Sequence, residues 1–260
     1  MFQTAPIEAA SQSELTSQIA ARLHTALTTH LQQAYAPDQR KNLRLFSATE
    51  TADLLGVTGQ FLRKCHSDGS LPEPEVIKNG RRFYSGEEIL QARHFLEASS
   101  RKPGKYLPGR REGDKLQVIQ LMNFKGGSAK STSAIHLCHY LALNGYRVLA
   151  IDLDPQGSLT GFCGIQTELE FEGAAIYDAL RYEDPVPMSE AIVETYFPGL
   201  HLAPARLVLS EFETETAVNA GRGVAFFEKL SLAIQSVEGD YEVVVMDSPP
   251  ALGFLTLTGL

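Results

Sequence analysis

The sequence of 260 residues predicts an α/β protein whose larger part is a parallel sheet covered by helices. Two observations support this fold class. From residue 116 onward, short apolar runs alternate with helical patterns, and a glycine-containing loop joins the first run to the first helix. Before residue 116 the pattern changes to short helices, a hairpin signal and an excess of basic residues, which predicts a smaller separate domain.

Composition narrows the class of protein. Apolar residues make up 43% of the chain, enough for a packed core. Cys65, Cys138 and Cys163 are odd in number and widely spaced, so they match neither a disulfide framework nor paired metal ligands. No apolar run is long enough to cross a bilayer, and the N-terminus lacks a secretion signal. We therefore expect a cytoplasmic protein with no membrane partner.

The net charge of -8 is unevenly distributed. Residues 37–115 hold 15 Lys+Arg and 11 Asp+Glu, a net of +4, whereas residues 116–260 hold 7 and 18, a net of -11. The basic domain is the candidate for contact with a phosphate backbone. A basic domain that is merely solvated is the open alternative.

Residues 1–36 contain the first predicted helix, over positions 11–36. Its apolar residues recur every four positions, which places them on one face. They are Leu15, Ile19, Leu23, Leu27 and Leu31. This stripe packs either on its own chain or against a second copy, and we favour a role in dimerisation.

Two short helices follow, each with its own capping signal. Ser47 and Glu50 fit a capping box, and Gly56 ends the helix that they open. Thr58 can cap a second helix that closes at Gly69. Two short helices around a tight turn form the skeleton of a helix-turn-helix.

A basic hairpin and a third helix complete this domain. An Asn-Gly pair at positions 79–80 predicts a tight hairpin turn, and the return strand carries Arg81 and Arg82. Ser85 and Glu88 make a second capping box, which opens the next helix.

This order of elements predicts a winged helix-turn-helix DNA-binding domain over residues 37–97. Its second helix would enter the major groove, and the hairpin arginines would contact the flanking backbone. The predicted DNA-binding residues are Thr58, Gln60, Arg63, Lys64, Arg81 and Arg82. A small helical domain that binds protein is the alternative. Residues 98–115, rich in Gly, Pro and basic side chains, are expected to form a basic linker.

The remaining chain, 116–260, alternates strand and helix. We expect a buried strand at 116–122, a helix at 128–145 that Asn144 and Gly145 end, and further strands at 146–152, 200–205 and 241–247. In a parallel sheet of this kind, ligands bind beyond the carboxyl ends of the strands. The loop after the first strand lies at such an end and opens a helix, which is the context of a phosphate site.

That loop reads NFKGGSAKST and departs from the usual phosphate-binding loop, G-x-x-x-x-G-K-[ST], at two positions. Phe124 and Ala129 stand where glycines are usual. Gly126 and Gly127 still allow the backbone to approach phosphate oxygens. Alanine fits at position 129 only if its backbone is not forced to positive φ. An additional lysine, Lys125, precedes the two glycines.

Three stretches together resemble a known family. KGGSAKST, VLAIDLDPQGS and VVVMDSPP are similar to the deviant Walker A, A′ and B motifs of the ParA/MinD ATPases, which are P-loop NTPases. Asp154 follows Lys130 by 24 residues, the spacing of that family. The stretch FPGLHLAPARLVLSEFETET and the order of the domains resemble the RepA branch, the partition ATPases of repABC operons.

The resemblance implies ATP and Mg²⁺ as cofactors and a role for each motif residue. Lys130 would contact the β- and γ-phosphates, and Lys125 would reach the phosphates of the partner subunit in a homodimer. Asp154 would position the attacking water. Ser131, Asp152 and Asp247 would serve the magnesium site. The implied ATP-binding residues are Lys125, Gly126, Gly127, Ser128, Ala129, Lys130, Ser131 and Thr132.

The expected function is therefore an ATP-dependent switch in plasmid partition. ATP would close a homodimer that binds operator and non-specific DNA at the nucleoid, and a ParB-type partner (RepB) would stimulate hydrolysis. The same protein would repress its own operon. The alternative is a repressor that senses nucleotide without a motor role. Because the sequence stops soon after the third motif, we expect an exposed sheet edge and weak or absent activity of these residues alone.

Overall fold

The computed structural model describes most of the chain. The described residues are 16–23, 25–26, 29, 41–111, 113–167, 171–221 and 226–260. They fall into two units, Met1–Arg40 and Lys41–Leu260.

In the first unit, the described positions are helical and exposed. Ile19 and Leu23 are 50% and 65% exposed, so these two side chains are not packed in a core within this unit. The helix predicted at 11–36 is confirmed at the described positions between 16 and 29. Leu15, Leu27 and Leu31 lie outside the described residues.

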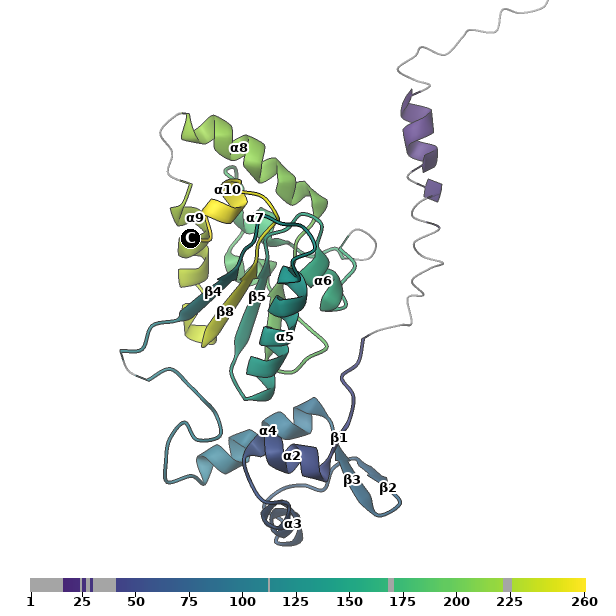
Figure 1. The fold of residues 1–260 in the computed structure, drawn as a ribbon, viewed down its shortest axis with the longest axis vertical. Coiled ribbons are helices and arrows are strands. Elements are labelled where there is room, and N and C mark those ends of the chain that lie inside the picture. The colour runs from purple at the N-terminus through teal and green to yellow at the C-terminus, as the bar shows by residue number, and fades with distance from the viewer. Residues whose placement is uncertain are drawn as a thin grey trace, which may run out of the picture. The chain divides into compact units, whose positions relative to one another are not determined.

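The second unit begins with a helix–hairpin segment, defined here as residues 46–98 (Figure 1). Its strands form a sheet of order β1-β3-β2, in which both pairs are antiparallel. The elements are β1 (Phe46–Ser47), α2 (Ala48–Leu55), α3 (Gly59–Ser67), β2 (Val76–Lys78), β3 (Arg81–Tyr84) and α4 (Gly86–Ala98).

Local signals set the ends of these elements, as predicted. The Ser47–Glu50 capping box opens α2, and Gly56 closes it in the left-handed conformation, φ 65°. The Thr58 hydroxyl accepts a hydrogen bond from the Phe61 N–H at the start of α3. Asn79 and Gly80 both have positive φ, 52° and 73°, which matches the twist of a two-residue hairpin.

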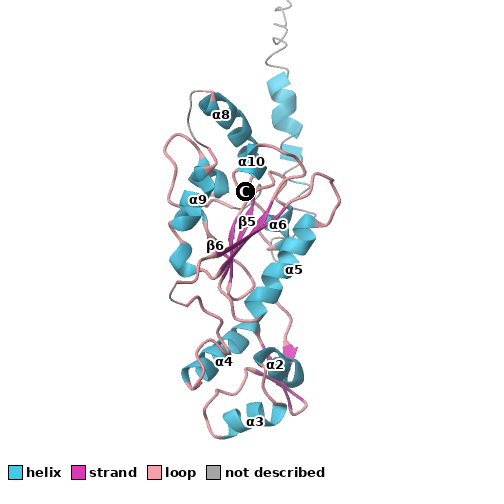
Figure 2. Cartoon of the chain, turned by 60° about the vertical axis from the view of Figure 1, so that its left-hand side comes forward, coloured by secondary structure: helices cyan, strands magenta, loops and turns pink. Residues whose placement is uncertain are grey.

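The larger sheet has the order β4-β8-β5-β7-β6. Figure 2 shows its strands in magenta with helices on either side. Its strands are β4 (Gln117–Leu121), β5 (Val148–Asp152), β6 (Val193–Glu194), β7 (Leu200–Ala203) and β8 (Val243–Asp247). Four of them are parallel, but β6 runs antiparallel to β7. The prediction of a parallel sheet is therefore wrong for β6. Two residues of β6 carry too little pattern for sequence reasoning to find a strand.

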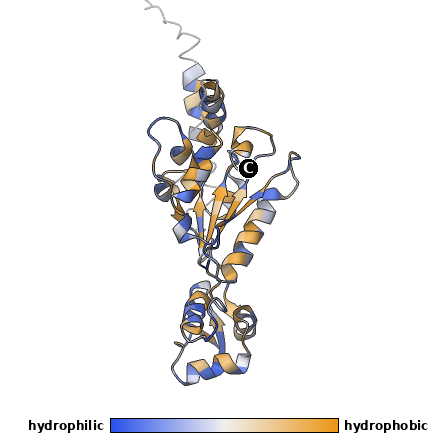
Figure 3. Cartoon of the chain, turned by 90° about the vertical axis from the view of Figure 1, so that its left-hand side faces the viewer, coloured by the Kyte–Doolittle hydropathy of each residue, from blue (hydrophilic) through white to orange (hydrophobic). Residues whose placement is uncertain are grey.

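Helices cover both faces of this sheet. They are α5 (Lys130–Leu143), α6 (Ser158–Phe162), α7 (Ile176–Leu180), α8 (Glu211–Ala220), α9 (Glu228–Gln235) and α10 (Phe254–Leu257), with 3-10 turns η1 (Met188–Ala191), η2 (Leu207–Ser210) and η3 (Glu238–Asp240). Along β5, Leu149 and Ile151 pack with α7, α8 and α9, whereas Val148 and Ala150 pack with α5 and α6. The strands are apolar on both faces for this reason (Figure 3).

Strand β4 differs from the prediction of a buried strand. Val118 and Ile119 are 46% and 39% exposed, and Met122 just after the strand is also exposed. Within the described residues β4 pairs with β8 on one side and with no strand on the other. It is therefore an edge strand of the described sheet, which the strand's own composition does not predict.

The predicted linker has no helix or strand over residues 99–111, yet it is anchored. The Glu97 carboxylate accepts hydrogen bonds from the N–H groups of Gly104, Tyr106 and Leu107. The Tyr106 side chain is buried in the core of the helix–hairpin segment. No described helix has the length and apolarity that crossing a membrane requires.

Candidate nucleotide-binding site

Strand register places three chain positions side by side at one edge of the sheet. Asp247 of β8 pairs with Leu121 of β4 on one side and with Asp152 of β5 on the other. These strands are parallel, so all three positions lie at carboxyl ends. The loop of residues 122–129 leaves β4 at this edge and leads into α5 (Figure 1). The predicted loop and the predicted aspartates are therefore brought together.

The loop presents a row of free backbone donors. Within the described residues, no hydrogen bond from the N–H groups of Gly126 to Thr132 reaches another protein group. The last three of these amides belong to the first turn of α5, where the helix dipole favours negative charge. Gly127 has φ 69°, a conformation that suits glycine. Amides arranged in this way form an anion cradle.

Ala129 has a positive φ, the conformation that alanine was expected not to fit. Its backbone has φ 61° and ψ 26°, the left-handed conformation, and it immediately precedes the first residue of α5. This conformation is also why α5 begins at Lys130 rather than at 128 as predicted. An L-residue with a Cβ atom pays about 1–2 kcal/mol for the left-handed region. The loop therefore holds a strained residue at the position where the usual motif has glycine.

The lysines and hydroxyls of the motif differ in exposure. Lys125 is exposed, and its N–H donates to Asn123 Oδ1 at 2.9 Å, which shapes the start of the loop. Lys130 and Ser131 are half-buried at the base of the cradle. The Ser128 hydroxyl oxygen is buried and has no hydrogen-bond partner among the described residues. Thr132 is exposed.

Asp247 is an unpaired buried carboxylate. Both of its oxygens are inaccessible and accept no hydrogen bond within the described part of the chain. Burial raises the pKa of Asp247 to about 6, against the opposing effects of the Ser131 hydroxyl and the Lys130 charge. Hydroxyl and carboxylate oxygens are ligands that Mg²⁺ accepts alongside phosphates and water. Asp247 and Ser131 thus fit the metal role predicted for them.

The described residues contain no cluster of three or more His, Cys, Asp or Glu side chains suited to a metal ion. A magnesium ion at Asp247 and Ser131 would therefore need further oxygen ligands from phosphate and water, as is usual for Mg²⁺ in nucleotide sites.

Asp152 is bound differently from Asp247. One oxygen accepts hydrogen bonds from the Thr160 N–H at 2.8 Å and the Thr160 hydroxyl at 2.7 Å, and the other accepts from the Asp154 N–H at 3.1 Å. Burial raises the pKa of Asp152 to about 7. Both oxygens are used within the protein, which favours a positioning role over a direct metal contact. Thr160 was missed by sequence reasoning, because no motif marks it.

Asp154 follows β5 and is half-buried near this group. One of its oxygens accepts a hydrogen bond from the Gln156 N–H at 3.0 Å. The charge of Asp154 also contributes, after burial, to the raised pKa of Asp247. Lys130, Ser131, Asp154 and Asp247 therefore form one site.

The predicted DNA-contacting residues lie elsewhere, in the helix–hairpin segment. Five of the six side chains are exposed, as expected: Thr58, Gln60, Arg63, Lys64 and Arg81. Arg82 is the exception, because its guanidinium donates two hydrogen bonds to the Glu73 carboxylate, at 2.5 and 2.7 Å. This ion pair uses guanidinium N–H groups of Arg82 that were expected to contact a phosphate.

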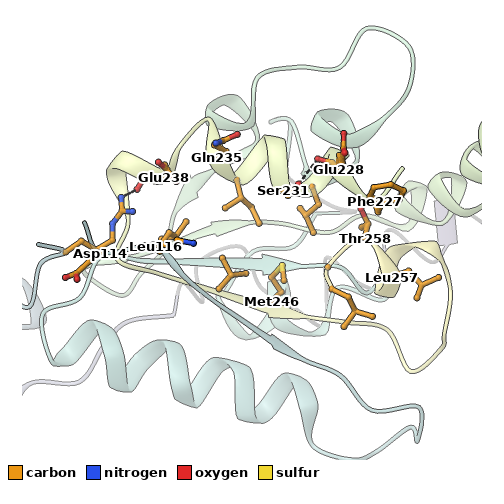
Figure 4. A pocket seen from close by; sticks show the side chains of 17 residues that line it. Asp114, Leu116, Phe227, Glu228, Ser231, Gln235, Glu238, Met246, Leu257 and Thr258 are labelled. Carbon is orange, nitrogen blue, oxygen red and sulfur yellow. Dashed lines mark hydrogen bonds between the residues drawn. The ribbon is translucent and has the colours of Figure 1, made fainter. Parts of the chain in front are cut away.

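A large hollow of the described surface lies away from this site. It measures about 900 Å³ and lies between α9, the exposed strand β4 and the last residues of the chain (Figure 4). Its lining includes Leu116, Phe227, Ser231, Met246 and Leu257. None of the predicted nucleotide-binding residues lines it.

A free amide cradle at the start of α5, next to acidic strand ends, defines a P-loop nucleotide-binding protein. The AAA_31 family, described as an AAA domain, matches residues 116–260. The chain belongs to this family and is of the ParA/MinD type.

Curated relatives agree with this assignment. A Sinorhizobium fredii (strain NBRC 101917 / NGR234) protein carrying the name replication protein A is 46% identical over 235 residues, covering 88% of this chain and 58% of that protein. Protein SopA of Escherichia coli (strain K12) is 32% identical over 230 residues, covering 85% and 57%. The chain thus spans somewhat more than half the length of these relatives. The alignment with the Sinorhizobium fredii protein covers 88% of this chain, which is more than residues 116–260 alone. It therefore also includes much of the helix–hairpin segment.

Among solved structures, a cobyrinic acid a,c-diamide synthase from Mycobacterium smegmatis, with bound ATP analog and magnesium, matches with a TM-score of 0.50. It is 37% identical and covers 56% of each chain. This match supports the nucleotide-binding fold in a protein of different activity.

Proposed function

We propose that this chain is the nucleotide- and DNA-binding part of a ParA-type partition ATPase. The observation that carries the proposal is the pairing of a free amide cradle with an unpaired buried carboxylate, Asp247, at the ends of adjacent strands. A relative named chromosome partitioning protein ParA, from Caulobacter vibrioides, supports the biological role.

ATP and Mg²⁺ are the proposed cofactors. The amides from Gly126 to Thr132 would hold phosphate oxygens, with Lys130 adding positive charge at the base of the cradle. Ser131 and Asp247 would hold the magnesium ion, which neutralises phosphate charge when bound. Asp154 would orient the attacking water, and Asp152 would keep the chain after β5 in place through Thr160.

Lys125 is the residue proposed to act between two subunits. It is exposed, and among the described residues its ammonium group forms no ion pair, so it is available to the phosphates of a second copy. A positive charge donated in this way makes hydrolysis depend on dimerisation, as an arginine finger does in other P-loop enzymes. We expect hydrolysis to be weak alone and stimulated by DNA and a ParB-type partner.

The helix–hairpin segment is proposed to be a winged helix-turn-helix that binds operator DNA, represses the protein's own operon and assists nucleoid association. Support comes from the exposed Gln60, Arg63 and Lys64 on α3 and Arg81 on the hairpin. Arg82 is proposed to brace the hairpin through Glu73 rather than to contact phosphate in the free protein.

The test is ATP hydrolysis by the full-length natural protein with DNA and its ParB-type partner, for wild type and Lys125→Ala. The variant should still bind a fluorescent ATP analogue, while its stimulated rate falls by roughly a thousandfold, the scale of an arginine-finger contribution. Lys115→Ala removes an exposed lysine just before β4 and serves as the matched control. It should hydrolyse ATP as wild type does.

Two results would point elsewhere. If Lys125→Ala keeps the wild-type rate, the inter-subunit role is wrong. If wild type hydrolyses no ATP although its DNA binding responds to nucleotide, the protein is a nucleotide-sensing repressor without a motor role.

A further inference from the structure

Arg93 of α4 is a buried cation with an unusual set of partners. Its side chain is almost wholly buried, at 4% exposed. Nε and Nη2 donate to the Leu143 carbonyl at 3.1 and 2.7 Å, Nη1 donates to the Tyr106 carbonyl at 3.0 Å, and Nη2 also donates to the Leu54 carbonyl at 2.6 Å. Among the described residues no carboxylate forms an ion pair with it.

Two of these carbonyls explain how the charge is tolerated. Leu143 is the last residue of α5, and Leu54 is the penultimate residue of α2. Carbonyls in the last turn of a helix lack helical partners and carry the negative end of the helix dipole. Arg93 therefore joins the C-terminal ends of two helices, one from the helix–hairpin segment and one from the sheet domain.

The far end of α5 is the nucleotide site. The helix runs from Lys130, in the cradle, to Leu143, at Arg93. Its 14 residues span about 20 Å as one rigid element. A shift of the first turn of α5 would therefore also move the Leu143 carbonyl at its other end.

The junction is packed closely enough to transmit such a displacement. A Cβ atom at Gly145 would lie 2.9 Å from Arg93 Cδ and 3.1 Å from the Tyr106 carbonyl oxygen. Leu143 packs against the core of the helix–hairpin segment, and Leu43 packs against that core and against the α5 face of the sheet. These contacts leave little space for α5 to move without moving its neighbours.

We propose that Arg93 couples nucleotide binding at the start of α5 to DNA binding by the helix–hairpin segment. The inference rests on the proposed function, since it needs both ligands. Arg93 acts as a positioning residue: it touches neither nucleotide nor DNA, and it ties α5 to α2 and α4. Coupling between two such sites commonly changes affinity 5- to 150-fold.

The experiment uses the full-length natural protein and the variants Arg93→Gln and Arg93→Lys. One probe is a labelled duplex spanning the DNA immediately upstream of its own coding sequence, with a mixed-sequence duplex for comparison. The other is a non-hydrolysable ATP analogue with Mg²⁺. Duplex affinity is measured with and without saturating analogue, and analogue affinity with and without duplex. His94→Ala, an exposed neighbour on α4, is the matched control.

In wild type and His94→Ala, each ligand should change the affinity for the other by the same factor. In Arg93→Gln both factors should fall to within about twofold of one, while each affinity measured alone stays within about threefold of wild type. Arg93→Lys keeps the charge but has fewer donors, so its factors should lie between the two. If Arg93→Gln proves unfolded by circular dichroism, Arg93→Lys decides the question.

A variant that is folded, binds both ligands and keeps the wild-type factor overturns the inference and leaves the proposed function standing. A wild-type protein that binds both ligands independently also overturns it. A wild-type protein that binds no duplex or no analogue refutes the proposed function itself, and the inference with it.

Discussion

Ala129 is the residue at which this loop departs most clearly from the ordinary phosphate-binding loop. Its left-handed backbone, φ 61°, is one that glycine adopts without cost. Ala129→Gly should therefore raise the free energy of unfolding by about 1 kcal/mol, the strain removed less the added flexibility of the unfolded chain. Chemical denaturation of wild type and variant measures the difference.

Ala217→Gly is the matched control for that prediction. Ala217 is exposed within α8, where glycine should lower the free energy of unfolding by about 1 kcal/mol. The same substitution then has opposite signs at the two positions. If Ala129→Gly also lowers stability, the left-handed conformation at Ala129 is not a source of strain.

For single residues, the sequence predicts which residues form the motifs better than it predicts their hydrogen-bond partners. Lys130 and Ser131 could be assigned because a phosphate loop needs those groups at that spacing. Nothing in the motif distinguishes Asp247, with unpaired oxygens, from Asp152, whose oxygens are bonded to Thr160 and Asp154. Arg93 had no signal, because its partners are backbone carbonyls distant in the sequence.

Among the elements, α5 links the nucleotide site to a half-buried histidine. His139 stacks on Phe197, with ring centroids 4.2 Å apart, and its Nε2 is 3.3 Å from the Tyr196 hydroxyl oxygen. Burial lowers the pKa of His139 to about 4, with a further contribution from the charges of His136 and Lys41. The folded protein therefore resists protonation of this ring.

The consequence is that His139 destabilises the folded protein in mild acid. Below the ordinary histidine pKa of about 6.5, the unfolded chain binds a proton that the folded protein does not. His139 lowers the melting temperature as the pH drops from about 6.5 to about 4, whereas Asp152 and Asp247, whose pKa values burial raises, act in the opposite direction. The destabilising part of the slope should be absent from His139→Phe, so its melting temperature should rise relative to wild type as the pH is lowered over this range. Thermal melts across that range measure it. His94→Ala, which alters an exposed histidine, should keep the wild-type slope, and an unchanged slope in His139→Phe would contradict the account.

Elements set by local signals were predictable, and those set by distant pairing were not. The Ser47 and Ser85 capping boxes mark α2 and α4 within four residues of sequence, and both are present. Strand β6 depends on its antiparallel partner β7, and the exposure of β4 depends on which strands lie beside it. Apolar composition alone describes β4 as buried, because composition does not report the order of strands.

For the molecule as a whole, the exposed edge of β4 beside the large hollow predicts self-association of residues 1–260. Unpaired strand edges next to apolar surface pair with other chains. Val118 is 46% exposed and lines the hollow, so Val118→Lys should shift this 260-residue chain towards monomer. Light scattering across a concentration series measures the change.

Phe61 offers a comparison for that experiment. It is 42% exposed on α3, away from the edge, so Phe61→Lys should leave the association unchanged. Equal effects of the two lysines would mean that added charge, rather than the β4 edge, controls association.

The Arg93 junction has a practical consequence for handling the protein. Contacts to a DNA backbone weaken steeply as salt rises, because counterions compete for the phosphates. The Arg93 bonds join a buried cation to carbonyl oxygens, and groups removed from solvent are screened far less. High salt should therefore strip nucleic acid from the purified protein while the helix–hairpin segment stays joined to α5. Protein prepared in this way would regain its response to both ligands on return to low salt.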